Sequence, residues 1–187
     1  MKSQKILLIA FLSLITLASC SDDDNNPLPV NEEEVITTLE VTLTNGTTTV
    51  TLLSTDLDGD GPNDPVVSVS GNFEKGMTYD GVLKLLNETE SPAENITEEV
   101  EEEALDHQFF YSTTNSIATF AYSDEDTDGN PIGIEFKMTA SADAGNGKVT
   151  FTLRHEPNKN ASGVKDGDIT NAAGETDIEV TFDVVVE

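Results

Sequence analysis

The chain has 187 residues with a single cysteine, and 9 lysine and arginine residues stand against 36 aspartate and glutamate residues, giving a net charge of −27. This length suits one domain with a tail and is too short for a two-lobed α/β binding protein. The acidity argues against nucleic acid as a partner, because nucleic-acid affinity depends on lysine and arginine neutralising phosphates.

The start of the chain has the pattern of an export signal. Two lysines precede an apolar run over residues 6–17, which is too short to cross a bilayer as a helix. The run ends in Leu17-Ala18-Ser19-Cys20, which resembles a bacterial lipobox, the motif in which the cysteine is acylated and the preceding peptide is removed. We therefore expect a signal peptide over 1–19 and attachment to the lipid bilayer through acylated Cys20. An ordinary secretory signal is the alternative.

The acidic segment that follows Cys20 predicts a tether over 20–33. Its first part, Ser21-Asp22-Asp23-Asp24, resembles the surface-export tag of Bacteroidetes-type lipoproteins, and Pro27 and Pro29 favour an extended chain. We expect an outer-membrane lipoprotein of the cell envelope that faces the cell surface rather than the periplasm. A plain solvated tether is the alternative. A single domain over 34–187 would follow.

From residue 34 onward, apolar side chains recur at every second position, which is typical of strands with one buried face. Leu39, Val41 and Leu43 alternate with polar residues, and Asn45-Gly46 directly after them favours a hairpin turn. Because no long helix alternates with these segments, we expect an all-β, Ig-like antiparallel sandwich of about eight strands. The candidate segments, allowing for one spurious member, are 35–45, 48–56, 66–71, 79–87, 108–113, 117–123, 132–140, 148–155 and 177–186.

An aspartate-rich loop lies between the second and third predicted strands. Asp56, Asp58 and Asp60 occupy alternate positions, as do the first ligands of a calcium loop. The twelfth position is Val67, so Asp64 would have to close the coordination shell. This loop is therefore the weaker of two calcium candidates.

Residues 91–107 depart from the alternating pattern. Ser91-Pro92-Ala93-Glu94 is typical of a helix start, and apolar residues at 96, 100 and 104 form one narrow stripe. We expect a short acidic helix over about 92–105, with a mobile acidic loop as the alternative.

The same acidic segment contains candidate ligands for a transition metal. In a helix, Glu99, Glu103 and His107 would lie on one face. His155, the second of two histidines in the chain, ends a predicted strand. Imidazole and carboxylate together suit divalent transition metals such as zinc, copper or iron. The sequence does not indicate whether the two histidines meet, and a solvated run of charges is the alternative.

The sharpest local motif is the loop over 124–135, which fits D-x-D-x-D-G-x5-E, the spacing of a twelve-residue calcium loop. The flanking segments read as strands, whereas an EF-hand has helices, and Pro131 occupies a position at which the EF-hand makes a backbone hydrogen bond. A metal-free hairpin loop is therefore the alternative to calcium binding. The candidate ligands are Asp124, Asp126, Asp128, Asn130 and Glu135.

Residue sets typical of enzymes are sparse. With Cys20 acylated, no cysteine nucleophile remains, and the sequence contains neither a glycine-rich phosphate loop nor a G-x-S-x-G elbow. Carboxylates are abundant, but among 36 acidic residues their abundance carries no specificity for acid–base chemistry. We expect no catalytic activity, with an unrecognised hydrolase as the alternative.

Two regions resemble a family of small Bacteroidetes-type lipoproteins: Leu85-Leu86-Asn87-Glu88 through His107-Gln108-Phe109-Phe110-Tyr111, and Leu153-Arg154-His155-Glu156-Pro157 together with residues 175–182. This family carries the label "type 1 periplasmic binding fold superfamily protein". That fold has two α/β lobes, which the strand periodicity here does not permit, so we expect family membership without that fold. The resemblance implies no established activity, but both histidines and the acidic run lie within its segments.

Two functional hypotheses follow. The first is a lipid-anchored envelope β-sandwich that binds a ligand or protein partner without catalysis, such as an accessory to an outer-membrane transporter. The second is a metal-capture lipoprotein that uses His107, His155 and nearby carboxylates.

Overall fold

A computed structural model describes residues 34–59 and 61–187. The expected signal peptide over 1–19, the lipidation site Cys20 and the tether over 20–33 lie outside the described residues. Within the described part, no helix has the length and apolar character needed to span a membrane.

Six strands form the larger sheet, in the order β3-β2-β1-β4-β7-β6. All neighbouring pairs are antiparallel. In the central strand β1, every second side chain is fully buried, as the alternation of apolar residues predicts. The strands are β1 (Thr38–Asn45), β2 (Thr48–Thr55), β3 (Val66–Val69), β4 (Thr78–Leu86), β6 (Ala118–Tyr122) and β7 (Glu135–Ala140).

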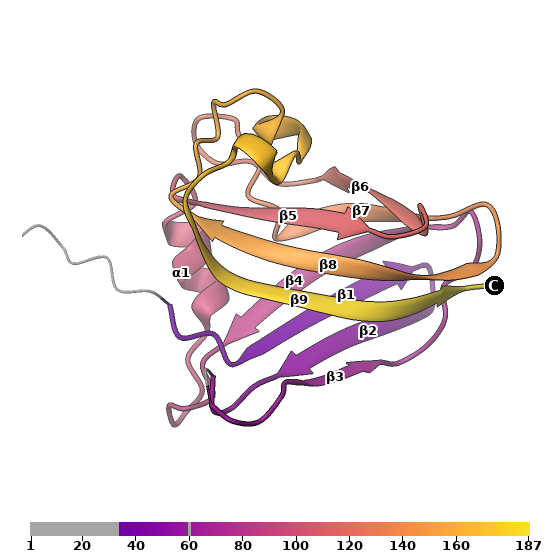
Figure 1. Cartoon of the computed structure of the whole chain (residues 1–187), viewed down its shortest axis with the longest axis horizontal. Coiled ribbons are helices and arrows are strands. Elements are labelled where there is room, and N and C mark those ends of the chain that lie inside the picture. Colours follow the sequence, from indigo (N-terminus) through magenta and orange to yellow (C-terminus); the bar gives the residue numbers. More distant parts are fainter. Residues whose placement is uncertain (1–33, 60) are drawn as a thin grey trace, which may run out of the picture. The chain divides into compact units, whose positions relative to one another are not determined.

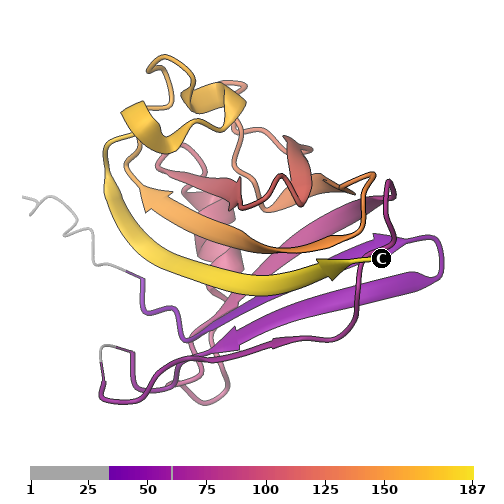
Figure 2. The same ribbon diagram turned by 45° about the vertical axis from the view of Figure 1, so that its right-hand side comes forward.

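Three strands form the second sheet, in the order β5-β8-β9. They are β5 (His107–Thr113), β8 (Gly145–His155) and β9 (Glu175–Val186). Figures 1 and 2 show this sheet lying across the larger one, so that the two form the layers of a sandwich. Aromatic side chains fill the space between the layers, with the ring of Phe151 in β8 packed 5.8 Å from Phe136 of the opposite sheet. The expected all-β sandwich is confirmed, with nine strands where about eight were predicted.

One α-helix, α1 (Ile96–Glu102), lies at the end of the sandwich where β5 begins (Figure 1). It is shorter than the predicted span of about 92–105, because the backbone of Glu94 pairs in both directions with that of Asn87, an extended arrangement that delays the helix start. Ile96 and Val100 are buried in the core, which accounts for the narrow apolar stripe.

Two short 3₁₀ turns, η1 (Val164–Asp166) and η2 (Ile169–Asn171), lie in the long connection from β8 to β9. This connection packs on the outer side of the three-stranded sheet, where Val164 and Ala172 bury Phe110. It also places the end of β8 beside the start of β9, at the same end of the sandwich as α1 (Figure 2).

Candidate metal centre

Four side chains converge at the end of the sandwich where β5 and β9 begin and β8 ends. Glu34, His107, His155 and Asp177 each offer one ligand atom, and these atoms all lie within 4.8 Å of one another. Their side chains are between 0% and 7% exposed. Buried imidazole and carboxylate groups in such proximity are suited to hold a metal ion.

The two histidines meet because their strands are paired in register. His107 opens β5 and His155 closes β8, and they are direct cross-strand partners. Each continues the inward-facing series of its own strand, next to Phe109 and Leu153, which are fully buried. The ring centroids are 4.6 Å apart. The sheet therefore places both imidazoles on its core face at its end.

A β-bulge brings Asp177 into this group. In β9 the core-facing residues are Val180, Phe182 and alternate neighbours, so strict alternation would turn Asp177 outward. The pairing instead passes from Ile178 opposite Leu153 to Thr176 opposite Arg154. Asp177 is the additional residue at this shift, and a bulge of this kind redirects a side chain.

The fourth ligand residue, Glu34, comes from the segment that leads into β1 of the other sheet. Thr37 fixes this segment, since its backbone N–H and its hydroxyl both donate to the carbonyl of Leu86 and its hydroxyl accepts from the N–H of Glu88. Three residues before this anchor, the carboxylate of Glu34 reaches the histidines of the three-stranded sheet. The group thus joins the two sheets.

The distances within the group approach those between ligands of a single ion. Ligands that surround an ion tetrahedrally at about 2.0–2.1 Å are about 3.3–3.4 Å apart. Nε2 of His107 lies 3.0 Å from Glu34 and 3.9 Å from Asp177, and Nδ1 of His155 lies 3.6 Å from each carboxylate. These distances involve both oxygens of each carboxylate, and one ligand atom from each residue can be chosen so that all four lie within 4.8 Å of one another, so the side chains would draw closer together around an ion.

A backbone carbonyl orients one of the two imidazoles. Nδ1 of His107 lies 3.1 Å from the carbonyl oxygen of Glu103. When Nδ1 carries the proton and donates to this oxygen, the lone pair of Nε2 faces the carboxylates. A second bond of this type is a regular feature of metal-ligating histidines, because it fixes the tautomer and the ring orientation.

The charges in the group are strongly coupled. Burial on its own raises the pKa of Glu34, but the contact with the His107 ring and its charge bring that pKa below its ordinary value. Burial on its own lowers the pKa of His107, but Glu34, the Glu103 carbonyl and Asp177 together bring it above its ordinary value. Protonation of His107 and ionisation of Glu34 therefore favour each other.

The structure brings together both histidines of the predicted transition-metal site, but not the two glutamates predicted with them. Helix α1 ends at Glu102 and His107 belongs to a strand, so the assumed helical spacing from Glu99 through Glu103 to His107 does not exist. The Glu103 side chain is exposed and contributes its backbone oxygen alone. Glu34 and Asp177 take the places of these glutamates, and neither has a local sequence signal.

The predicted calcium loop over 124–135 is held by hydrogen bonds from its own backbone. Both oxygens of Asp124 accept backbone N–H groups, from Gly133, Ile134 and Glu135. Among residues 34–59 and 61–187, no cluster of three or more carboxylates with metal-ligand spacing comes from this loop. Asp128 and Glu135 are exposed, and Asp126 has another cation as its partner. Calcium coordination by Asp124, Asp126, Asp128, Asn130 and Glu135 stays a prediction.

That cation is the ammonium group of Lys159, a side chain 4% exposed. It donates to the carboxylate of Asp126 at 2.9 Å and to the backbone oxygens of Ala104 and Pro131. Asp126 also accepts the N–H groups of Asp128 and Asn130, and these contacts lower its pKa although burial opposes them. Burial lowers the pKa of Lys159 in spite of its partners. The loop thus pairs the carboxylate of Asp126 with a cation that the protein itself supplies.

The weaker calcium candidate can be described in part. Asp60 lies outside the described residues. The carboxylate of Asp58 accepts the side-chain and backbone N–H groups of Asn63, which closes a small turn. Asp56 and Asp64 remain predicted ligands without a described calcium geometry.

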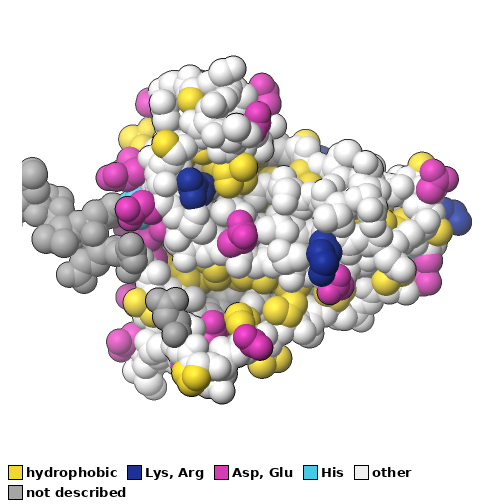
Figure 3. All heavy atoms as spheres, viewed as in Figure 1, with side chains coloured by type: hydrophobic (Ala, Val, Ile, Leu, Met, Phe, Trp, Pro, Cys, Tyr) yellow, Lys and Arg dark blue, Asp and Glu magenta, His cyan; other side chains and the backbone are white. Residues whose placement is uncertain are grey.

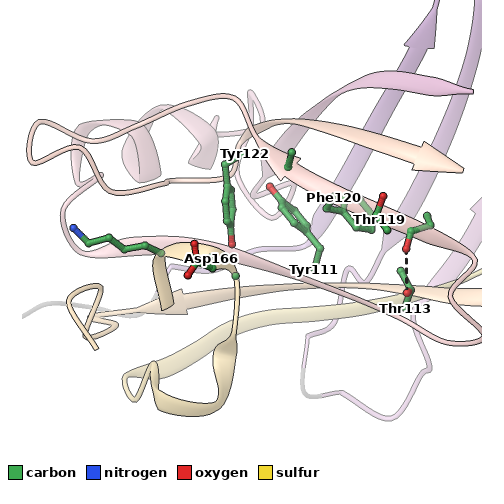
Figure 4. A pocket seen from close by; sticks show the side chains of 10 residues that line it. Tyr111, Thr113, Thr119, Phe120, Tyr122 and Asp166 are labelled. Atoms are coloured by element: carbon green, nitrogen blue, oxygen red, sulfur yellow. Dashed lines mark hydrogen bonds between the residues drawn. The ribbon is translucent and has the colours of Figure 1, made fainter. Parts of the chain in front are cut away.

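A groove opens where the edge strands β5 and β6 of the two sheets face each other. It has a volume of about 440 Å³ and ends at residues 165–167. Figure 4 shows Tyr122, Tyr111 and Phe120 along its wall, with Asp166 near Tyr122 and Thr113 at the other end. The hydroxyl groups of Tyr111 and Tyr122 donate to the backbone oxygens of Gly133 and Phe109, so they support the wall. Burial raises the pKa of Tyr122 to about 12.

Comparison with known proteins assigns no family to these features. No protein-family model, no curated protein and no solved structure matches the chain.

Proposed function

We propose that the protein binds a divalent transition-metal ion through Glu34, His107, His155 and Asp177, with zinc as the first choice. The observation that carries this proposal is the buried convergence of two imidazoles and two carboxylates. Two nitrogen and two oxygen donors suit Zn²⁺ and its neighbours in the first transition row. Calcium and magnesium prefer oxygen alone, and Cu⁺ prefers sulfur.

The closed arrangement favours capture or structural binding over catalysis. Catalytic zinc sites use three protein ligands and leave one position open to water or substrate, whereas structural sites are closed by four. Here four protein groups are available and their side chains are almost fully buried. The proposed role is therefore non-catalytic metal binding.

The envelope location rests on the lipobox-like end of the signal segment at Cys20. The chain has a net charge of −27, and such a strongly acidic protein would also attract cations to its surroundings. Figure 3 agrees with this charge, since acidic side chains spread over the viewed face with few lysines and arginines. Mass spectrometry of the protein from its native host tests the anchor, because acylation adds the mass of the acyl chains to the peptide that begins at Cys20.

Metal binding is tested by titrating the metal-stripped full chain with Zn²⁺ in a calorimeter, after elemental analysis of protein purified without chelator. We expect one ion per chain. D177N and H155Q should each weaken zinc binding by at least about 10-fold, the lower range for perturbing a metal site.

The matched control is the double substitution E99Q/E103Q, which removes two neighbouring charges from outside the four-residue group. Its zinc affinity should stay within a few-fold of wild type. No binding at micromolar zinc, or an equal loss in D177N and E99Q/E103Q, would contradict the assignment.

A second candidate function is ligand or protein-partner binding, for instance to an outer-membrane transporter, and the groove between β5 and β6 favours it. The groove has the volume and aromatic lining typical of ligand sites. A photo-crosslinking residue at exposed Ala121 in the groove, compared with one at exposed Thr181 on β9, tests it in the native host. A discrete adduct at 121 alone is the expected result, and equal labelling at both positions would contradict a specific site.

A further inference from the structure

Three of the four metal-binding residues belong to one sheet, whereas the fourth belongs to the segment that enters the other. His107, His155 and Asp177 lie on β5, β8 and β9, which are hydrogen-bonded neighbours along their length. Glu34 precedes β1, the central strand of the six-stranded sheet. A metal held by all four residues therefore connects two parts of the fold.

The entry segment, defined as residues 34–37, is unevenly held by the rest of the protein. Thr37 is fixed by its hydrogen bonds to Leu86 and Glu88, and Ile36 packs against the core. Val35 is 56% exposed. Oε2 of Glu34 is buried and has no hydrogen-bond partner among the described residues, so this oxygen is available to a cation. Among the described residues, both histidines contact the carboxylate of Glu34, with Nε2 of His107 3.0 Å from Oε1 and Nδ1 of His155 3.6 Å from Oε2.

We propose that the bound metal acts as a clasp that fastens the entry segment to the three-stranded sheet, so that metal loading controls whether this end of the sandwich is closed. This inference rests on the proposed metal binding. Metal binding and ordering of the entry segment would be coupled in both directions. If the metal orders the segment by a given factor, loss of the Glu34 ligand should weaken metal binding by the same factor.

The clasp lies at the point where the domain begins, so proteolysis at this point can report whether the clasp is closed. Residues 20–33 are the predicted tether, and the chain enters the described domain at Glu34. A clasp here makes the accessibility of the first residues of the domain depend on the metal. The Glu34–Val35 bond is a suitable reporter, because a glutamyl endopeptidase must accept the same carboxylate that the metal would hold.

The test follows hydrogen–deuterium exchange and glutamyl endopeptidase cleavage in the full chain, metal-stripped or loaded with Zn²⁺, with zinc binding measured in parallel by calorimetry. We expect zinc to slow cleavage after Glu34 and amide exchange in the entry segment by at least about 10-fold. Exchange at the β1–β2 hairpin around Gly46, which lies on the same sheet and away from the site, should not change.

The variants separate the clasp from metal binding itself. E34Q keeps three ligands, so it should still bind zinc, although with lower affinity. Zinc at saturation should no longer protect the entry segment of this variant from exchange. If wild type binds zinc and the segment shows no protection, or if E34Q is protected as well as wild type, the clasp is overturned while metal binding stands. If wild type binds no zinc, the proposed function fails first.

Discussion

Two groups of buried side chains contain carboxylates whose negative charge is balanced in different ways. In the loop over 124–131, the carboxylate of Asp126 is paired with the ammonium of Lys159, a group whose ordinary pKa lies far above neutral pH. At the end of the sandwich, Glu34 and Asp177 meet two imidazoles, which can lose their protons and then present lone pairs. The first group supplies its own cation, and the second is suited to exchange a proton for a metal ion.

The comparison teaches that aspartate spacing is a weak guide to metal binding in a very acidic chain. The loop has the complete calcium motif, but a lysine 33 residues away from Asp126 occupies the cation position. The histidine group has no motif, and its ligands come from four separate segments. Whether a group of carboxylates is suited to bind a metal ion depends on which cation the fold already places beside it.

We expect the largest loss of stability when Lys159, the cation that pairs with Asp126, is replaced. Lys159→Met leaves the buried carboxylate of Asp126 without its ammonium partner, so the free energy of unfolding should fall by about 3–5 kcal/mol. Denaturant unfolding measures this. Lys137→Met, which breaks the exposed pair with Asp80, should cost less than about 1 kcal/mol and serves as the control. Equal losses in the two variants would mean that the Lys159 pair is no stronger than a surface pair.

Zinc should stabilise the histidine group without affecting the loop. A ligand at 100 times its dissociation constant adds about 2.7 kcal/mol to the stability of the folded state. We expect a gain of this size in thermal melts of wild type with excess zinc, and almost none in His107→Gln. The gain should persist in E99Q/E103Q. A zinc-induced gain retained in His107→Gln would place the ion elsewhere.

The metal-free protein should show a pH dependence that arises from Glu34 and His107. The pKa of His107 is raised on folding, so its stabilising contribution is present below its ordinary value of 6.5 and is lost as pH rises through the folded value. The pKa of Glu34 is lowered, so its contribution is present above 4.5 and is lost as pH falls through the folded value. The contact therefore contributes most between these limits.

Thermal melts of metal-free wild type and His107→Gln across this pH range measure the effect. The difference between them should shrink as pH rises past the folded pKa of His107, whereas zinc affinity should rise over the same interval, since the metal requires neutral imidazole. A difference that grows toward high pH in the absence of metal would contradict the assigned direction.

Calcium should have the smallest effect. An extracellular calcium site with millimolar calcium near its dissociation constant would add about 0.4 kcal/mol. Because Lys159 and backbone N–H groups already occupy the carboxylates of the loop, we expect no resolvable shift of the melting temperature in 1 mM calcium. A saturable shift that disappears in Asp128→Asn would restore calcium binding at this loop.

The sandwich was predictable because its signal is local. Alternation of apolar residues fixes which face of a strand is buried, and every predicted strand segment is present with shifts of a few residues at its ends. One of the largest shifts has a tertiary cause. The segment predicted to begin at 132 joins β7 only at Glu135, since Ile132 first accepts the backbone N–H of Phe109 and thereby binds to β5.

The candidate site was predictable only in part because it depends on pairing between distant strands. The two histidines attract attention from their chemistry, but their meeting requires the register of β5 with β8. Asp177 depends on a bulge that breaks the period of its strand, and no local pattern marks that residue. Glu34 is the last of three consecutive glutamates, and its role comes from the path of the chain into β1.

Gly174, at the turn before β9, has a consequence for recognising such sites in other chains. Its φ of +70° is unfavourable for other residues, and a methyl group in its place would lie 2.1 Å from the carbonyl oxygen of His155. This close passage lets β9 begin against the end of β8, three residues before Asp177. Gly174 is therefore needed to position the four candidate ligands although it is not a ligand itself. A related protein that kept all four residues but replaced this glycine should not bring them together.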